Sequence, residues 1–253
     1  MLSSGCALPS GAGAKEETTL LQRGAAVLLT VLLLCMAASA LADSEGVIVQ
    51  SSCSIVQSGE YYMVYCFAQV HNNSSDIICL EEGSFDLHGG EQILATCEVS
   101  SLWPYFLNPG EDGYLFDIVP FEPDETGNPV VPTVTGIDYN IRYLTVNLEY
   151  GSTDLSAVSR IEADSSGALT VVCELTNMSD IDAYDPTVAF GLYTGEGSMI
   201  YADGMTLRGI GIPAGGTVLV RFAIDSVFVS QWQGYDVVPA EARVSASFRA
   251  DED

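Results

Sequence analysis

The sequence predicts an all-β protein in which two tandem immunoglobulin-like antiparallel β-sandwiches follow an N-terminal signal peptide. Three observations lead to this prediction: an apolar segment near the N-terminus, a duplicated pattern in the rest of the chain, and alternation of apolar and polar residues within each copy. We expect a signal peptide at residues 1–42, a first sandwich at 43–150, a linker at 151–156 and a second sandwich at 157–253.

The N-terminal segment has the three-part pattern of a secretory signal peptide. Residues 25–42 are uncharged and mostly apolar, Arg23 precedes them, and Ala40-Leu41-Ala42 is an A-x-A cleavage site. An uncleaved membrane anchor is the alternative, because the apolar run is as long as a short membrane span. A lipoprotein signal through Cys35 is disfavoured, because Leu34 stands where such signals need a small residue. We therefore expect a protein that is secreted or held in the cell envelope.

The charge of the chain excludes two classes of partner. Of its 253 residues, 34 are acidic and 8 are basic, so that the net charge is −26. Nucleic acids and anionic membrane surfaces are bound through Lys and Arg, yet residues 43–253 contain no Lys and residues 43–141 contain no basic residue. We expect a monomer whose partner is an unknown protein or carbohydrate at the cell surface.

The residues after position 42 repeat one pattern of strands and turns. Three blocks of the first copy correspond in order to three of the second: residues 66–77 to 171–181, 85–93 to 190–200, and 107–118 to 212–224. The offset between copies is 105 residues at the starts of the first two blocks and 104 between Pro109 and Pro213 of the third. Blocks in the same order at nearly constant offset indicate a duplicated domain.

Each copy has the pattern of a β-sandwich. In two corresponding strands every second residue is apolar, namely Val64, Cys66, Ala68 and Val70 in the first copy and Val171, Cys173 and Leu175 in the second. Such alternation is typical of strands with one buried face. Turn clusters such as NNSSD, NPGEDG and PAGG separate short strands, and copies of about 100 residues built in this way are typical of a sandwich. The short polar linker predicts that the two sandwiches lie close together.

One motif in each copy resembles a known family. Phe190-Gly191-Leu192-Tyr193 follows a strand that ends in T-N-x-S-D, and a P-x-G turn precedes the next apolar strand. This resembles the FxLYD family of extracytoplasmic bacterial β-sandwich domains, and Phe85-Asp86-Leu87-His88 is the corresponding motif of the first copy. The terminal Asp of the family motif is replaced by Thr194 and Gly89. The resemblance implies an immunoglobulin-like fold without catalysis, in an accessory module of envelope or secreted proteins, and it implies no ligand.

Four cysteines of the first copy are disulfide candidates: Cys53, Cys66, Cys79 and Cys97. Cys53 and Cys66 are equidistant from the centre of a Ser-Gly turn, so that antiparallel pairing about this turn places them directly opposite each other. Cys79 and Cys97 flank the next hairpin but are not quite equidistant from its centre. Cys173 has no predicted partner. The alternative to disulfide bonding is that some or all of the five cysteines are buried as small, unpaired apolar side chains.

The turn that contains Asp180, Asp182 and Asp185 is a candidate calcium site. Its carboxylates stand at nearly alternating positions, and calcium prefers oxygen ligands. The turn lacks the Gly and terminal Glu of an EF-hand loop, so that solvated loop acids are the alternative. We expect no cofactor, with calcium as the one metal to consider.

Aromatic residues near Trp103 and Tyr105 have no aromatic counterpart in the second copy. Exposed Trp and Tyr can contact sugar rings or a protein partner, whereas burial of alternate aromatics in the core is the alternative. Trp232 lies in a segment that we expect to be a loop.

The leading functional hypothesis is a non-catalytic exported binding or structural module. His71 and His88 are the only histidines, and we expect both to be exposed turn residues without a catalytic partner. The alternative hypothesis is an extracellular hydrolase that uses Asp117, Glu122 and Asp124 near the aromatic segment of the first copy. Two of these acids in one concave pocket, with raised pKa values, would favour the enzyme.

Overall fold

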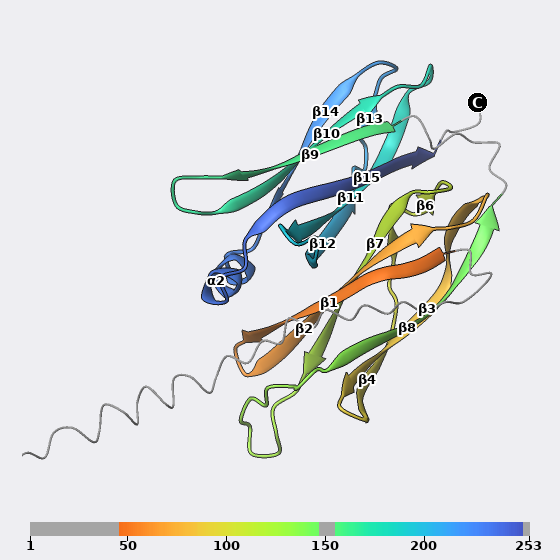
Figure 1. Cartoon of the computed structure of the whole chain (residues 1–253). Coiled ribbons are helices and arrows are strands. Elements are labelled where there is room, and N and C mark those ends of the chain that lie inside the picture. The colour runs from red at the N-terminus through yellow and green to blue at the C-terminus, as the bar shows by residue number, and fades with distance from the viewer. Residues whose placement is uncertain (1–45, 147–154, 250–253) are drawn as a thin grey trace, which may run out of the picture. The chain divides into compact units, whose positions relative to one another are not determined.

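The computed structural model describes residues 46–146 and 155–249, and strands make up most of both segments (Figure 1). The predicted signal peptide lies outside the described residues. Most of the predicted linker does too, and the first described strand of the second copy begins at Leu155, inside the range expected for the linker. Among the residues that the structure describes, no helix has the length and apolar character needed to cross a membrane.

The first copy folds into a sandwich of two antiparallel sheets. One sheet has the strand order β1-β2-β7-β5, and in the other β3 pairs with β4, β6 and β8. The strands are β1 (Gly46–Ser58), β2 (Tyr61–Asn72), β3 (Ile77–Gly89), β4 (Gln92–Glu98), β5 (Leu102–Trp103), β6 (Phe106–Leu107), β7 (Asp112–Phe121) and β8 (Gly136–Val146).

The second copy repeats this topology. One sheet has the order β14-β10-β9, and in the other β11 pairs with β12, β13 and β15. Its elements are β9 (Leu155–Ala163), β10 (Leu169–Asn177), β11 (Ala183–Thr194), β12 (Met199–Thr206), β13 (Gly211–Ile212), β14 (Thr217–Ala223), α2 (Ser226–Gly234) and β15 (Pro239–Arg249).

The pairing of corresponding strands confirms the predicted duplication. In the first copy β3 is the central strand between β4 and β8, and in the second β11 is central between β12 and β15. Phe85 on β3 and Phe190 on β11 are both buried, and they lie at corresponding registers, opposite Tyr139 and Val244 respectively. The predicted fold class, two tandem antiparallel β-sandwiches, is therefore confirmed.

A fully buried asparagine ends the second strand of each sandwich in the same way. The side-chain amide of Asn72 donates to the carbonyls of Asp76 and Leu107, and that of Asn177 donates to Ile181 and Ile212. In each copy the asparagine oxygen also accepts the N–H and the hydroxyl of the serine two residues later. Because a buried amide needs all of these partners, the N-x-S sequence determines the same loop twice.

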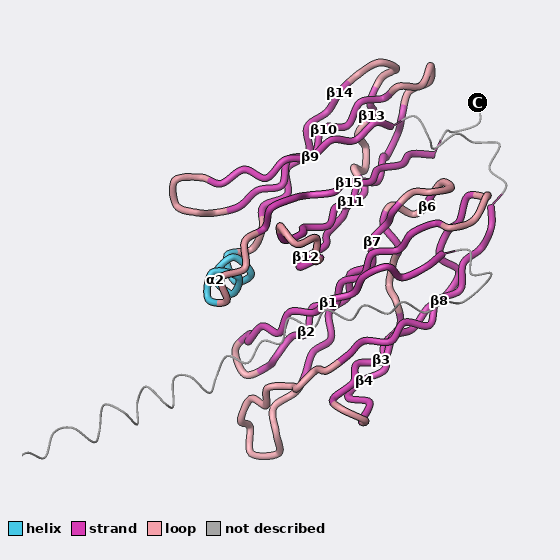
Figure 2. Tube along the Cα trace, in the orientation of Figure 1, coloured by secondary structure: helices cyan, strands magenta, loops and turns pink. Residues whose placement is uncertain are grey.

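The helix α2 is an addition to the second copy, and the sequence prediction of a loop around Trp232 is wrong (Figure 2). Asp225 caps its N-terminus by accepting the N–H of Val227. Phe228, Val229 and Trp232 form its buried side. Nine residues are too short for a clear helical period in the sequence, so that the cap and these tertiary contacts stabilise the helix instead.

The two sandwiches share one of the two apolar cores. The first core lies inside the first sandwich and includes Val64, Cys66, Phe85 and Leu87. The second core lies inside the second sandwich but also includes Val56, Phe67 and Tyr114 of the first. The prediction that the sandwiches lie close together is confirmed.

Candidate functional site

The seam between the sandwiches is defined here by Gln69, Trp103 and Tyr114 of the first sandwich and Gly191, Tyr193, Gly204 and Arg243 of the second. Two glycines allow the close approach. A Cβ atom on Gly191 would lie 2.6 Å from Cε1 of Tyr114, and one on Gly204 would lie 3.2 Å from Cβ of Trp103. The packing distances mean that no larger side chain fits at either glycine without movement.

Buried tyrosine hydroxyls cross the seam. The Tyr193 hydroxyl donates to Oε1 of Gln69 at 2.8 Å, and the Tyr114 hydroxyl donates to the carbonyl of Arg243 at 3.1 Å. The guanidinium carbon of Arg243 lies 4.0 Å from the centroid of the Tyr193 ring, which is a cation–π contact. Burial raises the pKa of Tyr193 to about 12. Both phenols are therefore neutral at physiological pH and act as hydrogen-bond donors.

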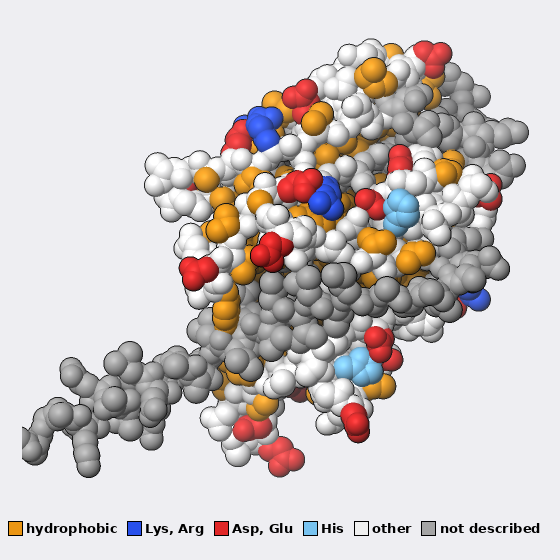
Figure 3. All heavy atoms as spheres, in the orientation of Figure 1, with side chains coloured by type: hydrophobic (Ala, Val, Ile, Leu, Met, Phe, Trp, Pro, Cys, Tyr) orange, Lys and Arg blue, Asp and Glu red, His pale blue; other side chains and the backbone are white. Residues whose placement is uncertain are grey.

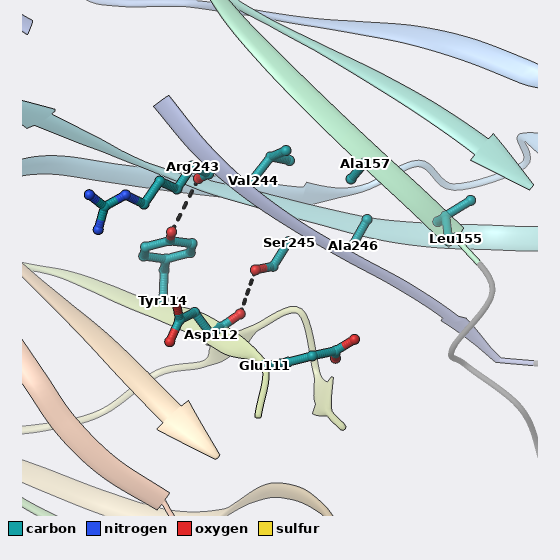
Figure 4. A pocket seen from close by; sticks show the side chains of 9 residues that line it. All are labelled: Glu111, Asp112, Tyr114, Leu155, Ala157, Arg243, Val244, Ser245 and Ala246. Carbon is teal, nitrogen blue, oxygen red and sulfur yellow. Dashed lines mark hydrogen bonds between the residues drawn. The ribbon is translucent and has the colours of Figure 1, made fainter. Parts of the chain in front are cut away.

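A polar cavity of about 260 Å³ opens beside the seam (Figure 4). It is lined by Glu111, Asp112, Tyr114, Leu155, Ala157, Arg243, Val244, Ser245 and Ala246. Its polar side chains already have protein partners. Oε2 of Glu111 accepts from Asn108, Asp112 faces Nδ1 of His71 at 2.9 Å, and the Ser245 hydroxyl donates to the Asp112 carbonyl. The cavity therefore belongs to a structural joint between the sandwiches.

A second concave site, which we call the end groove, lies at one end of the first sandwich. It has a volume of about 520 Å³ and is lined by Gly89, Gly90, Leu94, Phe121, Glu122, Val130, Val131, Pro132 and Thr133. These residues come from the β3–β4 hairpin, the end of β7 and the loop 122–135 that leads into β8. Apolar side chains with one carboxylate at the edge are typical of a binding site.

Hydrogen bonds hold the loop of the end groove against the hairpin. The Thr135 N–H donates to the His88 carbonyl at 2.6 Å, and the Gly90 N–H donates to the Thr135 hydroxyl at 2.7 Å. Gly89 is required here, because a Cβ would lie 3.0 Å from the Thr133 carbonyl oxygen. The groove is therefore preformed.

The three acids of the hydrolase hypothesis do not converge. Glu122 lines the end groove, but Asp117 and Asp124 are not among its lining residues. Asp117 accepts the N–H of Ser100, and partial burial raises its pKa. Asp124 accepts from Thr126 and Asn128 in a tight turn, and these hydrogen bonds lower its pKa. The paired-acid geometry that would favour the enzyme is not found for these three residues.

In the predicted calcium turn, two carboxylates accept hydrogen bonds from backbone N–H groups. Asp182 accepts the N–H of Ala214 at 3.1 Å, and Asp185, whose φ is 45°, accepts the N–H of Gly209. Within the described residues, no group of three His, Cys, Asp or Glu side chains is placed to hold a metal ion. Calcium at Asp180, Asp182 and Asp185 stays a prediction.

The aromatic pair of the first copy is placed mainly at the seam. Trp103 pairs with Tyr114 across β5 and β7 and stacks on Phe116 at 5.9 Å between ring centroids. Tyr105 is 41% exposed, and its hydroxyl lies 3.5 Å from that of Thr206. Tyr105 is therefore accessible to a ligand, whereas most of Trp103 packs between the sandwiches.

The cysteine geometry separates the two candidate pairs. Cys53 lies directly opposite Cys66, as the sequence predicts, and both are buried. Cys97 lies opposite Phe85, six residues along β3 from Cys79, which puts the two cysteines about 20 Å apart along the strand. A Cys79–Cys97 disulfide is therefore excluded, because bonded cysteines have Cα atoms within about 7 Å. No disulfide joins Cys66, Cys79, Cys97 or Cys173 among the described residues, and the Cys53–Cys66 bond stays a prediction.

Both histidines lie in strands, so that the expectation of exposed turn residues is wrong. His71 on β2 faces Asp112, and Nε2 of His88 on β3 lies 3.1 Å from Oδ2 of Asp138. Each ring is half-buried beside a carboxylate.

Sequence reasoning missed the seam. The family motif singles out Tyr193, but no pattern in the sequence singles out Gln69 or Tyr114. The available signal was the pair of glycines at 191 and 204, since Gly in the interior of a strand often marks a close approach of another segment.

Comparisons with known proteins do not identify a family for this chain. No protein-family model and no curated protein matches it. A red sea bream transglutaminase structure is 12% identical over 69% of this chain and 27% of its own, with a TM-score of 0.21. A calcium-binding mutant of Bacteroides uniformis beta-glucuronidase 2 is 14% identical over 78% of this chain and 27% of its own, with a TM-score of 0.19. The chain thus spans about a quarter of the length of each.

Proposed function

We propose that the protein is a non-catalytic exported binding module, in which two joined sandwiches present the loops of the first to a partner. The observation that carries the proposal is that one surface joins the two sandwiches while another stays free to bind. The sheet face around Gly191 is used for docking between sandwiches, while the apolar end groove of the first sandwich stays open to solvent. The scattered positions of Asp117, Glu122 and Asp124 favour binding over catalysis.

The composition and the family resemblance support this proposal. The F-x-L-Y motif supplies two core residues, Phe190 and Leu192, and one seam residue, Tyr193. All three are explained by packing, as expected for an FxLYD-like accessory module. On the face seen in Figure 3, acidic side chains are spread over the surface and basic ones are few. Such a surface suits a cationic partner at the cell surface.

Export is tested by recovering the full chain from a secretion-competent bacterial host. We expect the protein outside the cytoplasm, with an intact mass that begins at Asp43. The control variant Ala42→Asp should keep residues 1–42, because the cleavage site needs a small residue. Soluble full-length wild-type protein in the cytoplasm would contradict export.

Catalysis is tested on the same preparation with panels of ester, peptide and glycoside substrates. We expect no turnover above that of a heat-inactivated sample. Turnover that is lost in Asp117→Asn or Glu122→Gln would replace the module with the hydrolase of the alternative hypothesis.

A further inference from the structure

We infer that the end groove binds a cationic, apolar peptide segment of a partner protein, with apolar side chains in the groove and Lys or Arg side chains at its edge. This inference rests on the proposed binding function and deepens it, because it names the class of partner. Four properties of the groove support it: an apolar lining, exposed backbone, a one-sided charge and a preformed shape.

The lining is apolar and accessible. Val130 is 49% exposed and Val131 is 37% exposed, and Leu94, Phe121 and Pro132 complete the apolar surface. A cavity of about 520 Å³ is within the range of small-ligand and peptide sites. Large apolar side chains that stay exposed around one concavity mark an interaction site.

The exposed backbone favours a peptide over a small apolar molecule. Within the part of the chain that the structure describes, the backbone N–H and C=O groups of Val130 and Val131 have no protein hydrogen-bond partner. Pro129 and Pro132 flank them, so that the segment is held extended. An extended peptide could pair with these groups as a strand pairs with a free edge.

The charge around the groove has one sign. Glu91 is at the hairpin tip, Glu122 is in the lining, and Asp124 and Glu125 are in the same loop. No Lys or Arg occurs between residues 43 and 141, and Arg142 is already paired with Glu81 and Glu82. An uncompensated acidic edge around an apolar surface is complementary to a peptide that alternates cationic and apolar residues.

The test uses labelled synthetic peptides and fluorescence anisotropy with the chain from Asp43 onward in its folded, two-sandwich form. The probe is a peptide of alternating Leu and Lys, and the matched peptides replace Leu by Ser or Lys by Ser. The key variant is Val130→Asp, which removes apolar surface from the groove while it adds an acid. The control variant is Val158→Asp, at a 61% exposed valine on β9 of the second sandwich.

We expect the Leu-Lys peptide to bind wild type and Val158→Asp equally and Val130→Asp about tenfold more weakly, as burial of one valine side chain implies. Both substituted peptides should bind weakly, and added salt should weaken the Leu-Lys complex. General attraction to an acidic protein would instead leave Val130→Asp at full affinity or above it, and this result would overturn the inference.

Two other outcomes would also overturn it. Equal binding of the Leu-Ser peptide would mean that the groove takes apolar chains without regard to charge. A concentration-dependent dimer that is lost in Val130→Asp, seen by sedimentation, would mean that a second copy covers the groove. Neither result depends on export, so that failure of this inference is distinguishable from failure of the proposed localisation.

Discussion

The same sheet face has opposite roles in the two sandwiches. In the second sandwich the outer face of β11, β12 and β15 has small residues at its centre, Ala189, Gly191 and Gly204, and it packs on the first sandwich. In the first sandwich the corresponding face has Asp86 at the position of Gly191 and His88 at that of Tyr193. The difference teaches that one face of a duplicated fold can take a new role through its outward-facing residues, while the inward-facing Phe85 and Phe190 of the same strands are retained.

The two sandwiches also differ in an inner row, by which we mean core-facing residues that lie side by side across three neighbouring strands. In the second, Ile161, Val171 and Phe222 lie side by side across three strands. The corresponding row in the first is Cys53, Cys66 and Asp117. The first sandwich therefore has thiols and a half-buried carboxyl where the second has only apolar side chains.

The largest effect is expected when the second sandwich receives the outward-facing residue of the first, which tests whether the two faces differ in role. Gly191→Asp places a side chain within 2.6 Å of Tyr114 and a charge in the seam. We expect a loss of at least about 3 kcal/mol in the free energy of unfolding, measured by urea denaturation.

The reciprocal variant Asp86→Gly is the control for that experiment. It removes the hydrogen bond from the Thr96 hydroxyl at an accessible position and places a flexible glycine inside β3, and we expect a loss below about 2 kcal/mol. Equal losses in the two variants would mean that the two faces do not differ in role.

The position of Cys53 opposite Cys66 predicts a redox effect confined to the first sandwich. Oxidation should join Cys53 to Cys66 and stabilise the protein by about 3 kcal/mol, the chain-entropy value for a loop of about 14 residues. Peptide mapping without reduction identifies the bond, and thermal unfolding with and without reductant measures its effect. Cys53→Ala should abolish the redox dependence, whereas Cys79→Ala should leave it intact. Free Cys53 and Cys66 thiols in oxidised, folded protein would refute the pairing.

Tyr193, one of the two tyrosines of the seam, allows a finer test of the docking face. Tyr193→Phe removes the hydroxyl that donates to Gln69 and leaves that buried amide oxygen without this donor. We expect a loss of about 1–2 kcal/mol in urea denaturation. Tyr184→Phe, at a 54% exposed tyrosine of the same strand, should change stability by less than about 0.5 kcal/mol. A neutral Tyr193→Phe would show that packing alone joins the sandwiches.

The smallest effect concerns the carboxyl in the inner row. Because partial burial raises the pKa of Asp117 in the folded state, this group favours the folded protein when protonated and loses that contribution as pH rises through its folded pKa. Asp117→Asn should therefore gain melting temperature relative to wild type at about pH 7 but not at about pH 4. The matched variant Asp164→Asn should show the opposite trend, because local hydrogen bonds lower the pKa of Asp164. A constant difference between Asp117→Asn and wild type at the two pH values would contradict the burial argument.

Local sequence was sufficient wherever the determining interactions are short in range. The duplication, the alternation along β2 and β10, and the opposition of Cys53 and Cys66 about a short turn could all be predicted, because turns and side-chain periodicity set strand register. The same reasoning was wrong for Cys79 and Cys97. The strand β4 ends at Glu98, so that β3 continues beyond it to pair with β6 and β8, and a register shift next to His88 moves Cys97 opposite Phe85.

By itself, the sequence determined two sandwiches, their core-facing residues and a strongly acidic surface. Only the tertiary structure decided which outward faces meet, because Tyr193 and Gln69 are 124 residues apart and nothing local distinguishes a seam residue from an exposed one. The same holds for the end groove, where Leu94, Phe121 and Val130 come from three elements. The physical reason is that periodicity reports whether a side chain points inward or outward in its own sheet, whereas docking and binding depend on which outward side chains another part of the chain covers.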